Sequence, residues 1–221
     1  MTGRPALPIA ANSEDPRVLI VDDDPGICLA LSGLFRSVGL QASVFTSARE
    51  LLKSPLLPLA GCIILDIRMP GVSGLDLQEE LSDMGVEAPI VFLTGYGDIP
   101  MSVKAMKSGA VDFLTKPFRD QDLLDAVSQA LSRDRRRRTE AKSQADLQNL
   151  YLALTPREQE VMSLVAKGLM NKQIASEIGV TEITVKVHRG RVMRKMGANS
   201  LADLVRVHDL LRGAGAGRAR D

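Results

Sequence analysis

The sequence predicts an α/β domain with a doubly wound, five-stranded parallel sheet, joined by a long helical linker to an all-α domain of four helices. Between residues 17 and 118, short apolar runs alternate five times with helical patterns, which is typical of parallel strands covered by helices on both faces. Residues 155–212 contain only helical patterns. The net charge is −6 over residues 17–132 and +8 over residues 133–221. This asymmetry indicates two domains with different partners, the basic one meeting a polyanion.

The strands of the first domain are marked by short apolar runs. These runs occupy residues 18–21, 42–45, 62–65, 89–93 and 112–114, and their length suits strands that are buried on both faces. Helical patterns lie between them. One is capped by Asp24 and opened by Pro25, and others cover residues 73–84 and 99–107.

A single helix is expected across the linker, because no proline or glycine occurs between Pro117 and Pro156. Its apolar stripe is interrupted by a charged block at residues 133–138 and resumes near Leu147. Two interpretations stay open for this segment: a coiled-coil contact between two copies, and a solvated linker whose arginines face water or DNA phosphates. The expected organisation is a disordered leader (1–16), the sheet domain (17–132), the linker (133–153), the helical domain (154–212) and a disordered tail (213–221).

Four helices are expected after the linker, opened by polar or capping residues and in three cases closed by glycine. The starts lie at Thr155, Asn171, Thr181 and Ser200, and the stops at Gly168, Gly179 and Gly197. The second and third helices are short and are joined by a turn that contains glycine. This is the pattern of a helix-turn-helix.

The composition excludes several classes of protein. Tryptophan is absent and aromatic residues make up 3% of the chain, which argues against an aromatic surface that stacks single-stranded bases. No apolar run approaches the ~18 residues of a membrane helix, and the first 16 residues lack the apolar centre of a signal peptide. Cys28 and Cys62 have the spacing of neither a disulfide framework nor a metal site. We therefore expect a cytoplasmic protein with no membrane partner.

Polar residues follow the predicted strands at the sheet edge where doubly wound folds bind ligands. Asp22 and Asp23 follow the first strand, Asp66 the third, Thr94 the fourth and Lys116 the fifth. Clustered carboxylates repel one another unless a cation intervenes, and oxygen ligands without histidine indicate Mg²⁺, with Mn²⁺ as a substitute. A carboxylate beside such an ion and a lysine is equipped to accept a phosphoryl group. No glycine-rich nucleotide loop accompanies this edge.

The segments VLIVDDDP, LDIRMPGVSG, VFLTGYGD and DFLTKPF resemble, in order and spacing, the flavodoxin-like receiver domain of bacterial two-component response regulators. The resemblance implies that Asp66 accepts a phosphoryl group from the phosphohistidine of a cognate sensor histidine kinase. It implies that Asp23 and Asp66 ligate the metal directly, Asp22 through water, and Arg68 through its backbone carbonyl.

The same resemblance assigns the residues that respond to the phosphoryl group. It implies that Lys116 contacts the phosphoryl group and that Thr94 moves toward it. Phe113 matches the aromatic residue that turns inward when the threonine moves. An ordinary core role for Phe113 remains equally open.

The third helix of the basic domain carries a cationic face. At about 100° per residue, Val185, Val192 and Met196 share one side and are expected to be buried. The other side suits the phosphates, guanines and thymine methyls of a major groove. The expected DNA-binding residues are Lys186, Val187, Gly190, Arg191 and Arg194, with Arg189 at the border of the face and Lys172 on the preceding helix.

The segment from LTPREQEVMSLVAKGL to MRKMGANSLADLV resembles the LuxR-type helix-turn-helix of the NarL/FixJ group, and the whole chain is most similar to FixJ-like regulators. The resemblance implies a helix-turn-helix from Asn171 to Gly190, base reading by Lys186 and Val187, and dimerisation through the last helix. Gly190 stands where a longer side chain is common.

Together these features predict a bacterial transcriptional response regulator rather than an enzyme. Phosphorylation is expected to promote a homodimer that binds paired half-sites in double-stranded DNA and activates transcription with RNA polymerase. Three alternatives remain: a phosphatase centred on the acidic edge, a constitutive DNA-binding protein with a structural receiver, and an RNA-binding antiterminator.

Overall fold

The computed structural model of the chain describes residues 17–95 and 99–217. They form two compact units, one ending at Arg137 and the other beginning at Arg138. The expected leader (1–16) and the last four residues of the expected tail lie outside the described residues.

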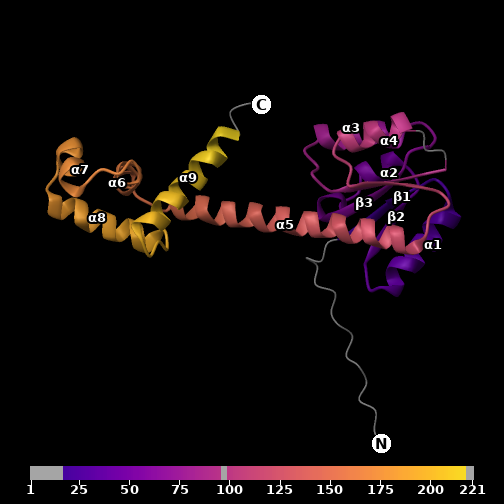
Figure 1. The fold of residues 1–221 in the computed structure, drawn as a ribbon, viewed down its shortest axis with the longest axis horizontal. Coiled ribbons are helices and arrows are strands. Elements are labelled where there is room, and N and C mark those ends of the chain that lie inside the picture. The colour runs from indigo at the N-terminus through magenta and orange to yellow at the C-terminus, as the bar shows by residue number, and fades with distance from the viewer. Residues whose placement is uncertain (1–16, 96–98, 218–221) are drawn as a thin grey trace, which may run out of the picture. The chain divides into compact units, whose positions relative to one another are not determined.

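The first unit contains a five-stranded parallel sheet with the strand order β2-β1-β3-β4-β5. Figure 1 shows this sheet between two layers of helices. The strands are β1 (Arg17–Val21), β2 (Ala42–Phe45), β3 (Ala60–Asp66), β4 (Ile90–Thr94) and β5 (Asp112–Thr115). This order, with its reversal between β1 and β3, places the carboxyl ends of β1, β3 and β4 along one edge. The predicted doubly wound α/β fold is confirmed.

Helices cover both faces of this sheet. The helices of this unit are α1 (Pro25–Ser37), α2 (Ala48–Leu52), α3 (Gly74–Asp83), α4 (Ile99–Lys107) and the start of α5 (Asp120–Leu152). Apolar residues of α2, α3 and α4 pack into one core, whereas α1 and α5 pack into the other. α2 and the short 3₁₀ helix Leu57–Leu59 were not predicted from the sequence, since five- and three-residue helices carry too little periodicity.

The central residues of the strands are mostly apolar because their side chains alternate between these two cores. Leu19, Ile63 and Phe92 face the core under α2–α4, while Ile20 and Ile64 face the core under α1 and α5. All five are at most 1% exposed. Burial on both faces stabilises the sheet and fixes its register, because a slip of one residue would exchange the two faces.

The charged block of α5 is more ordered than a solvated linker. Asp134 is fully buried, and its carboxylate accepts a hydrogen bond of 2.7 Å from Arg137. Arg137 also donates to Glu87, on the loop before β4, at 2.8 Å. A carboxylate can be buried there because a cation one helical turn away neutralises it. The interpretation of residues 133–138 as fully solvated is therefore wrong at these two positions.

The second unit consists of the end of α5 and four further helices, as predicted. These are α6 (Pro156–Ala166), α7 (Asn171–Ile178), α8 (Glu182–Lys195) and α9 (Leu201–Gly217). Their core includes Leu154, Val161, Ile174 and Leu204. α9 ends at Gly217, so its last residues fall within the segment 213–221 that was expected to form a tail.

Candidate functional site

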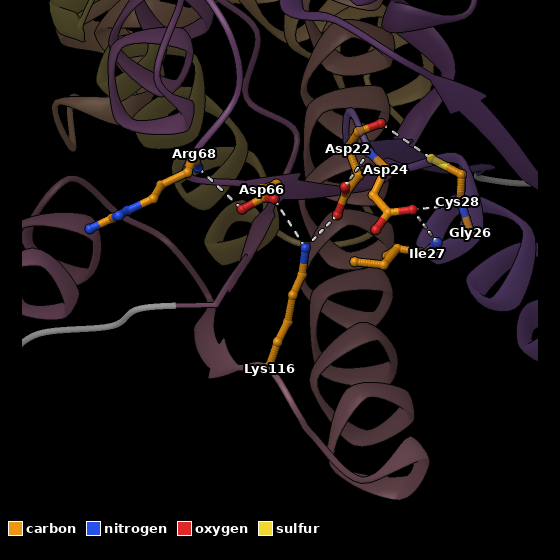
Figure 2. A network of polar contacts seen from close by, with 8 residues as sticks. All are labelled: Asp22, Asp24, Gly26, Ile27, Cys28, Asp66, Arg68 and Lys116. Atoms are coloured by element: carbon orange, nitrogen blue, oxygen red, sulfur yellow. Dashed lines mark hydrogen bonds and ion pairs between the residues drawn. The ribbon is translucent and has the colours of Figure 1, made fainter.

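The carboxyl edge of the sheet brings the predicted acidic residues and the lysine together. Asp22, directly after β1, is 1% exposed, and Asp66, the last residue of β3, is 7% exposed. Lys116 follows β5, and its Nζ lies 2.6 Å from Asp22 Oδ2 and 3.0 Å from Asp66 Oδ2. Figure 2 shows the ammonium between the two carboxylates. One cation thus links two buried anions at the point where the strands end.

Backbone groups hold the other carboxylate oxygens of this pair. Asp22 Oδ1 accepts from the Asp24 N–H at 2.9 Å, and Asp66 Oδ1 accepts from the Arg68 N–H at 3.2 Å (Figure 2). The Asp24 carboxylate is engaged elsewhere, because Oδ1 accepts from the Gly26 N–H at 2.7 Å and caps α1. Asp24 is therefore a helix cap, while Asp22 and Asp66 are oriented as a pair.

Burial and hydrogen bonding act against each other at Asp22 and at Lys116, and the net effect raises the pKa of both groups. Burial raises the pKa of Asp22, against the opposing effects of the Lys116 and Asp24 hydrogen bonds. Burial alone would lower the pKa of Lys116, but its bonds to Asp22 and Asp66 outweigh that effect and raise it. Lys116 accordingly remains an ammonium at neutral pH.

The donor set fits a hard divalent cation. Asp22, Asp23 and Asp66 each offer a carboxylate oxygen, and these atoms lie within 4.8 Å of one another. Asp23 is exposed and accepts no hydrogen bond from any described residue. Three carboxylates against one ammonium leave an excess of negative charge, which oxygen-ligated Mg²⁺ neutralises well.

A glycine that the sequence analysis did not single out shapes the loop behind Asp66. Gly74 is the first residue of α3, and its N–H donates to the Ile67 carbonyl at 2.9 Å. A Cβ at Gly74 would lie 2.4 Å from the backbone oxygen of Asp66. Only glycine permits this close approach, and its place in the segment GVSG was the available signal.

The two candidate switch residues occupy different environments. Thr94, the last residue of β4, is fully buried, and its carbonyl accepts the Lys116 N–H at 2.7 Å. Phe113 on β5 is half-buried, pairs with Phe92, and packs against the core under α2–α4. The packing of Phe113 agrees with a core residue as well as with a switch.

In the second unit, α8 has the two sides expected of a recognition helix. Val185 and Val192 are fully buried and Met196 is 3% exposed, which confirms the predicted apolar stripe. The opposite side of α8 carries three exposed cations, Lys186, Arg191 and Arg194. None of them makes an ion pair with a described residue, and the same is true of the exposed Lys172 on α7. Gly190 and Val187 lie among them and are exposed. The result is a surface of uncompensated positive charge.

Arg189 differs from the other predicted cations. It is half-buried, and its Nη1 donates to Asn171 Oδ1 at 3.2 Å. Asn171 is the first residue of α7. Arg189 therefore holds α8 against α7.

An ion pair between a buried carboxylate and a partly exposed lysine, not predicted from the sequence, joins α6 to the end of α8. Lys195 Nζ lies 2.7 Å from Oε2 of Glu158, whose side chain is 3% exposed. The same oxygen accepts the Thr155 N–H at 2.8 Å and completes a capping box. The Lys195 and Thr155 hydrogen bonds lower the pKa of Glu158. The capping box was predictable from TPRE, but a partner 37 residues away was not.

Comparisons with known proteins agree with both units. Residues 18–128 match the response regulator receiver domain, and residues 152–208 match the bacterial regulatory proteins of the luxR family. The chain is 57% identical over 194 residues to Nodulation protein W of Bradyrhizobium diazoefficiens, covering 88% of this chain and 86% of that protein. The chain belongs to the two-component response regulators of the NarL/FixJ type. Its partners are accordingly a histidine kinase and DNA.

Two further relatives support this membership. The transcriptional regulatory protein FixJ of Azorhizobium caulinodans is 40% identical over 190 residues, covering 86% of this chain and 90% of that one. The solved structure of the response regulator StyR superposes with a TM-score of 0.81 at 47% identity, covering 88% of this chain and 98% of that one. The relatives of this response regulator are transcriptional regulators rather than enzymes. None of the described helices is long and apolar enough to cross a membrane.

Proposed function

We propose that this response regulator is switched by transfer of a phosphoryl group to Asp66. The observation that carries the proposal is the Lys116 ammonium, held between the carboxylates of Asp66 and Asp22 at 3.0 and 2.6 Å. A lysine so placed neutralises charge on the equatorial oxygens of the transferring group. Asp66 retains some exposure at the sheet edge, whereas Asp22 is almost fully enclosed.

The transfer forms one bond and breaks another. An Asp66 oxygen attacks the phosphorus of the kinase phosphohistidine, a P–O bond forms, and the P–N bond breaks. The leaving imidazole nitrogen takes a proton from solvent, and the product is an acyl phosphate on Asp66. Mg²⁺, held by Asp23, Asp66 and the Arg68 carbonyl with Asp22 through water, would supply charge neutralisation to the phosphoryl oxygens.

Thr94 and Phe113 are proposed to carry the signal from the acceptor. Thr94 ends the strand next to β3, so its hydroxyl needs only a short movement to meet the phosphoryl group. Phe113, on the neighbouring strand β5, would follow. These shifts would alter the face formed by α4 and β5, and the altered face would favour a homodimer in the cytoplasm. Two copies would then engage paired half-sites and recruit RNA polymerase.

The recognition surface is proposed to be the exposed side of α8. Lys186 and Val187 would read base edges, Gly190 would allow close approach, and Arg191 and Arg194 would contact phosphates. Lys172 would contact the backbone from α7, and Arg189 would do so while it holds Asn171.

The test is phosphorylation of the Asp66→Asn variant by a phosphorylated histidine kinase and by acetyl phosphate. We expect loss of label with both donors and loss of donor-stimulated DNA binding. Asp83→Asn, an exposed carboxylate on α3, is the matched control and should label normally. Persisting label would move the acceptor elsewhere. DNA binding that is equally strong with and without donor would favour a constitutive regulator.

A further inference from the structure

One apolar side chain on the recognition surface has no structural role. Ile183 is the second residue of α8 and is 77% exposed. It contributes to no core cluster, and the cap of the helix is made by Thr181, whose hydroxyl accepts the Thr184 N–H at 3.2 Å. β-Branched isoleucine also has a lower helix propensity than alanine or lysine. Neither packing nor local structure therefore accounts for isoleucine at this position.

Ile183 lies on the same side of α8 as the predicted base-reading residues. Lys186, Val187 and Gly190 follow it by three, four and seven residues, which places all four on one face. Val187 is 47% exposed and stands about 40° around the helix and about 6 Å along it from Ile183. The two side chains form a short apolar strip at the amino-terminal end of α8, the end that meets base edges in helix-turn-helix proteins.

The charge around this strip identifies the surface that it fits. Lys186 and Arg194 border it and make no ion pair with described residues, so the matching surface is strongly anionic. An apolar strip inside a cationic surface needs a partner that presents anions and apolar groups together. The major groove of DNA does so, because thymine C5-methyl groups project between two rows of phosphates.

We propose that Ile183 is a specificity-determining residue that packs against a thymine methyl group in each half-site. The inference rests on the proposed DNA-reading role of α8 and extends it by one position toward the amino-terminal end of the helix. Val187 then contacts the neighbouring base step, and the apolar strip ends at Gly190, where a Cβ would meet nothing within 4 Å.

The experiment selects binding sites from random duplex DNA with the full-length chain in acetyl phosphate, using wild type and Ile183→Ala. Each selected thymine is then replaced in turn by deoxyuridine, which lacks only the methyl group. We expect one thymine per half-site whose replacement weakens wild-type binding about fourfold, the effect of burying one methyl-sized group. Ile183→Ala should bind the thymine and uracil versions equally. The control, Leu29→Ala, removes a side chain on α1 that is 75% exposed and should behave as wild type.

Two outcomes would overturn the assignment of Ile183. One is that Ile183→Ala selects the same sequence and retains the same response to uracil. The other is that it loses affinity equally for all sequences, with an unchanged melting curve, which would make Ile183 a nonspecific contact. A wild-type chain that selects no sequence at all would instead overturn the DNA-reading function proposed for α8, so the two failures are distinguishable.

Discussion

Replacing Lys195 by methionine tests how the recognition helix is held in place. In the wild type, Glu158 Oε2 contacts Lys195 Nζ and accepts the Thr155 N–H at 2.8 Å, and the Glu158 side chain is only 3% exposed. The variant removes the lysine and leaves the Thr155 N–H as the donor to this buried oxygen. Removing one partner of a fully buried pair costs about 3–5 kcal/mol, and an exposed pair contributes about 1 kcal/mol or less. Because the Lys195 side chain is 40% exposed, we expect an intermediate loss of about 1–3 kcal/mol in the second unit.

Hydrogen exchange of the full-length chain, read by mass spectrometry on peptides, measures this loss locally. Amides of α6 and α8 should exchange about 5- to 150-fold faster in Lys195→Met than in wild type. Amides of β3 and β4 in the first unit should be unchanged. The double variant Glu158→Gln/Lys195→Met should be less destabilised than the sum of the single variants. Unchanged exchange in α6 and α8, or strict additivity, would refute the pairing.

The same pair has a pH signature whose sign follows from the lowered pKa of Glu158. A carboxyl group with a depressed folded-state pKa contributes stability above its unfolded value, here 4.5, and loses it as the pH falls through the folded value. The stability difference between wild type and Lys195→Met should therefore be full at pH 6 and shrink below about pH 4.5. Urea denaturation followed by circular dichroism at both pH values measures it, and a constant difference would contradict the argument.

Three further changes have defined outcomes. Gly74→Ala should destabilise the receiver by about 1–3 kcal/mol, because its Cβ would lie 2.4 Å from the Asp66 carbonyl oxygen. The control is Gly33→Ala, whose Cβ meets nothing within 4 Å. Equal melting curves for the two variants would contradict the expected clash at Gly74. Gly190→Ala should stabilise the second unit by about 0.5–1 kcal/mol, seen as slower exchange in α8, and faster exchange would be contrary. Mg²⁺ should raise the receiver's melting temperature in wild type and Asp83→Asn but much less in Asp23→Asn; equal rises in all three would exclude Asp23 as a ligand.

Much of the fold could be predicted because its signals are local. The five apolar runs gave every strand to within two residues at either end. Proline and capping residues gave helix starts, and glycine gave helix ends. Asp24, for example, caps α1 as its position before Pro25 predicts. The convergence of Asp22, Asp66 and Lys116 also followed, since the carboxyl ends of parallel strands share an edge.

The features that escaped prediction depend on residues far apart in the chain. Glu87 pairs with Arg137, and Glu158 with Lys195, and no periodicity links either pair. The requirement for glycine at position 74 depends on a carbonyl eight residues earlier that folds back over it. A periodic pattern of residue types predicts which face of an element a side chain lies on, but it does not predict which distant residue that side chain contacts.

The ion pairs of the described residues separate structural charges from those available for function. In Asp134–Arg137–Glu87 and Glu158–Lys195 the buried carboxylate is paired with a cation, and the ion pairs join separate parts of the fold. Where charged side chains lack partners, the sign of the excess charge indicates the kind of ligand that would neutralise it. Three carboxylates share one ammonium at the sheet edge, which favours a bound cation. Lys186, Arg191 and Arg194 have no counter-ion among the described residues, which favours a polyanion. Phosphorylation would add negative charge at the edge that already lacks positive charge, so neutralisation by Mg²⁺ and Lys116 has to precede or accompany it. We therefore predict that labelling of Asp66 depends on Mg²⁺.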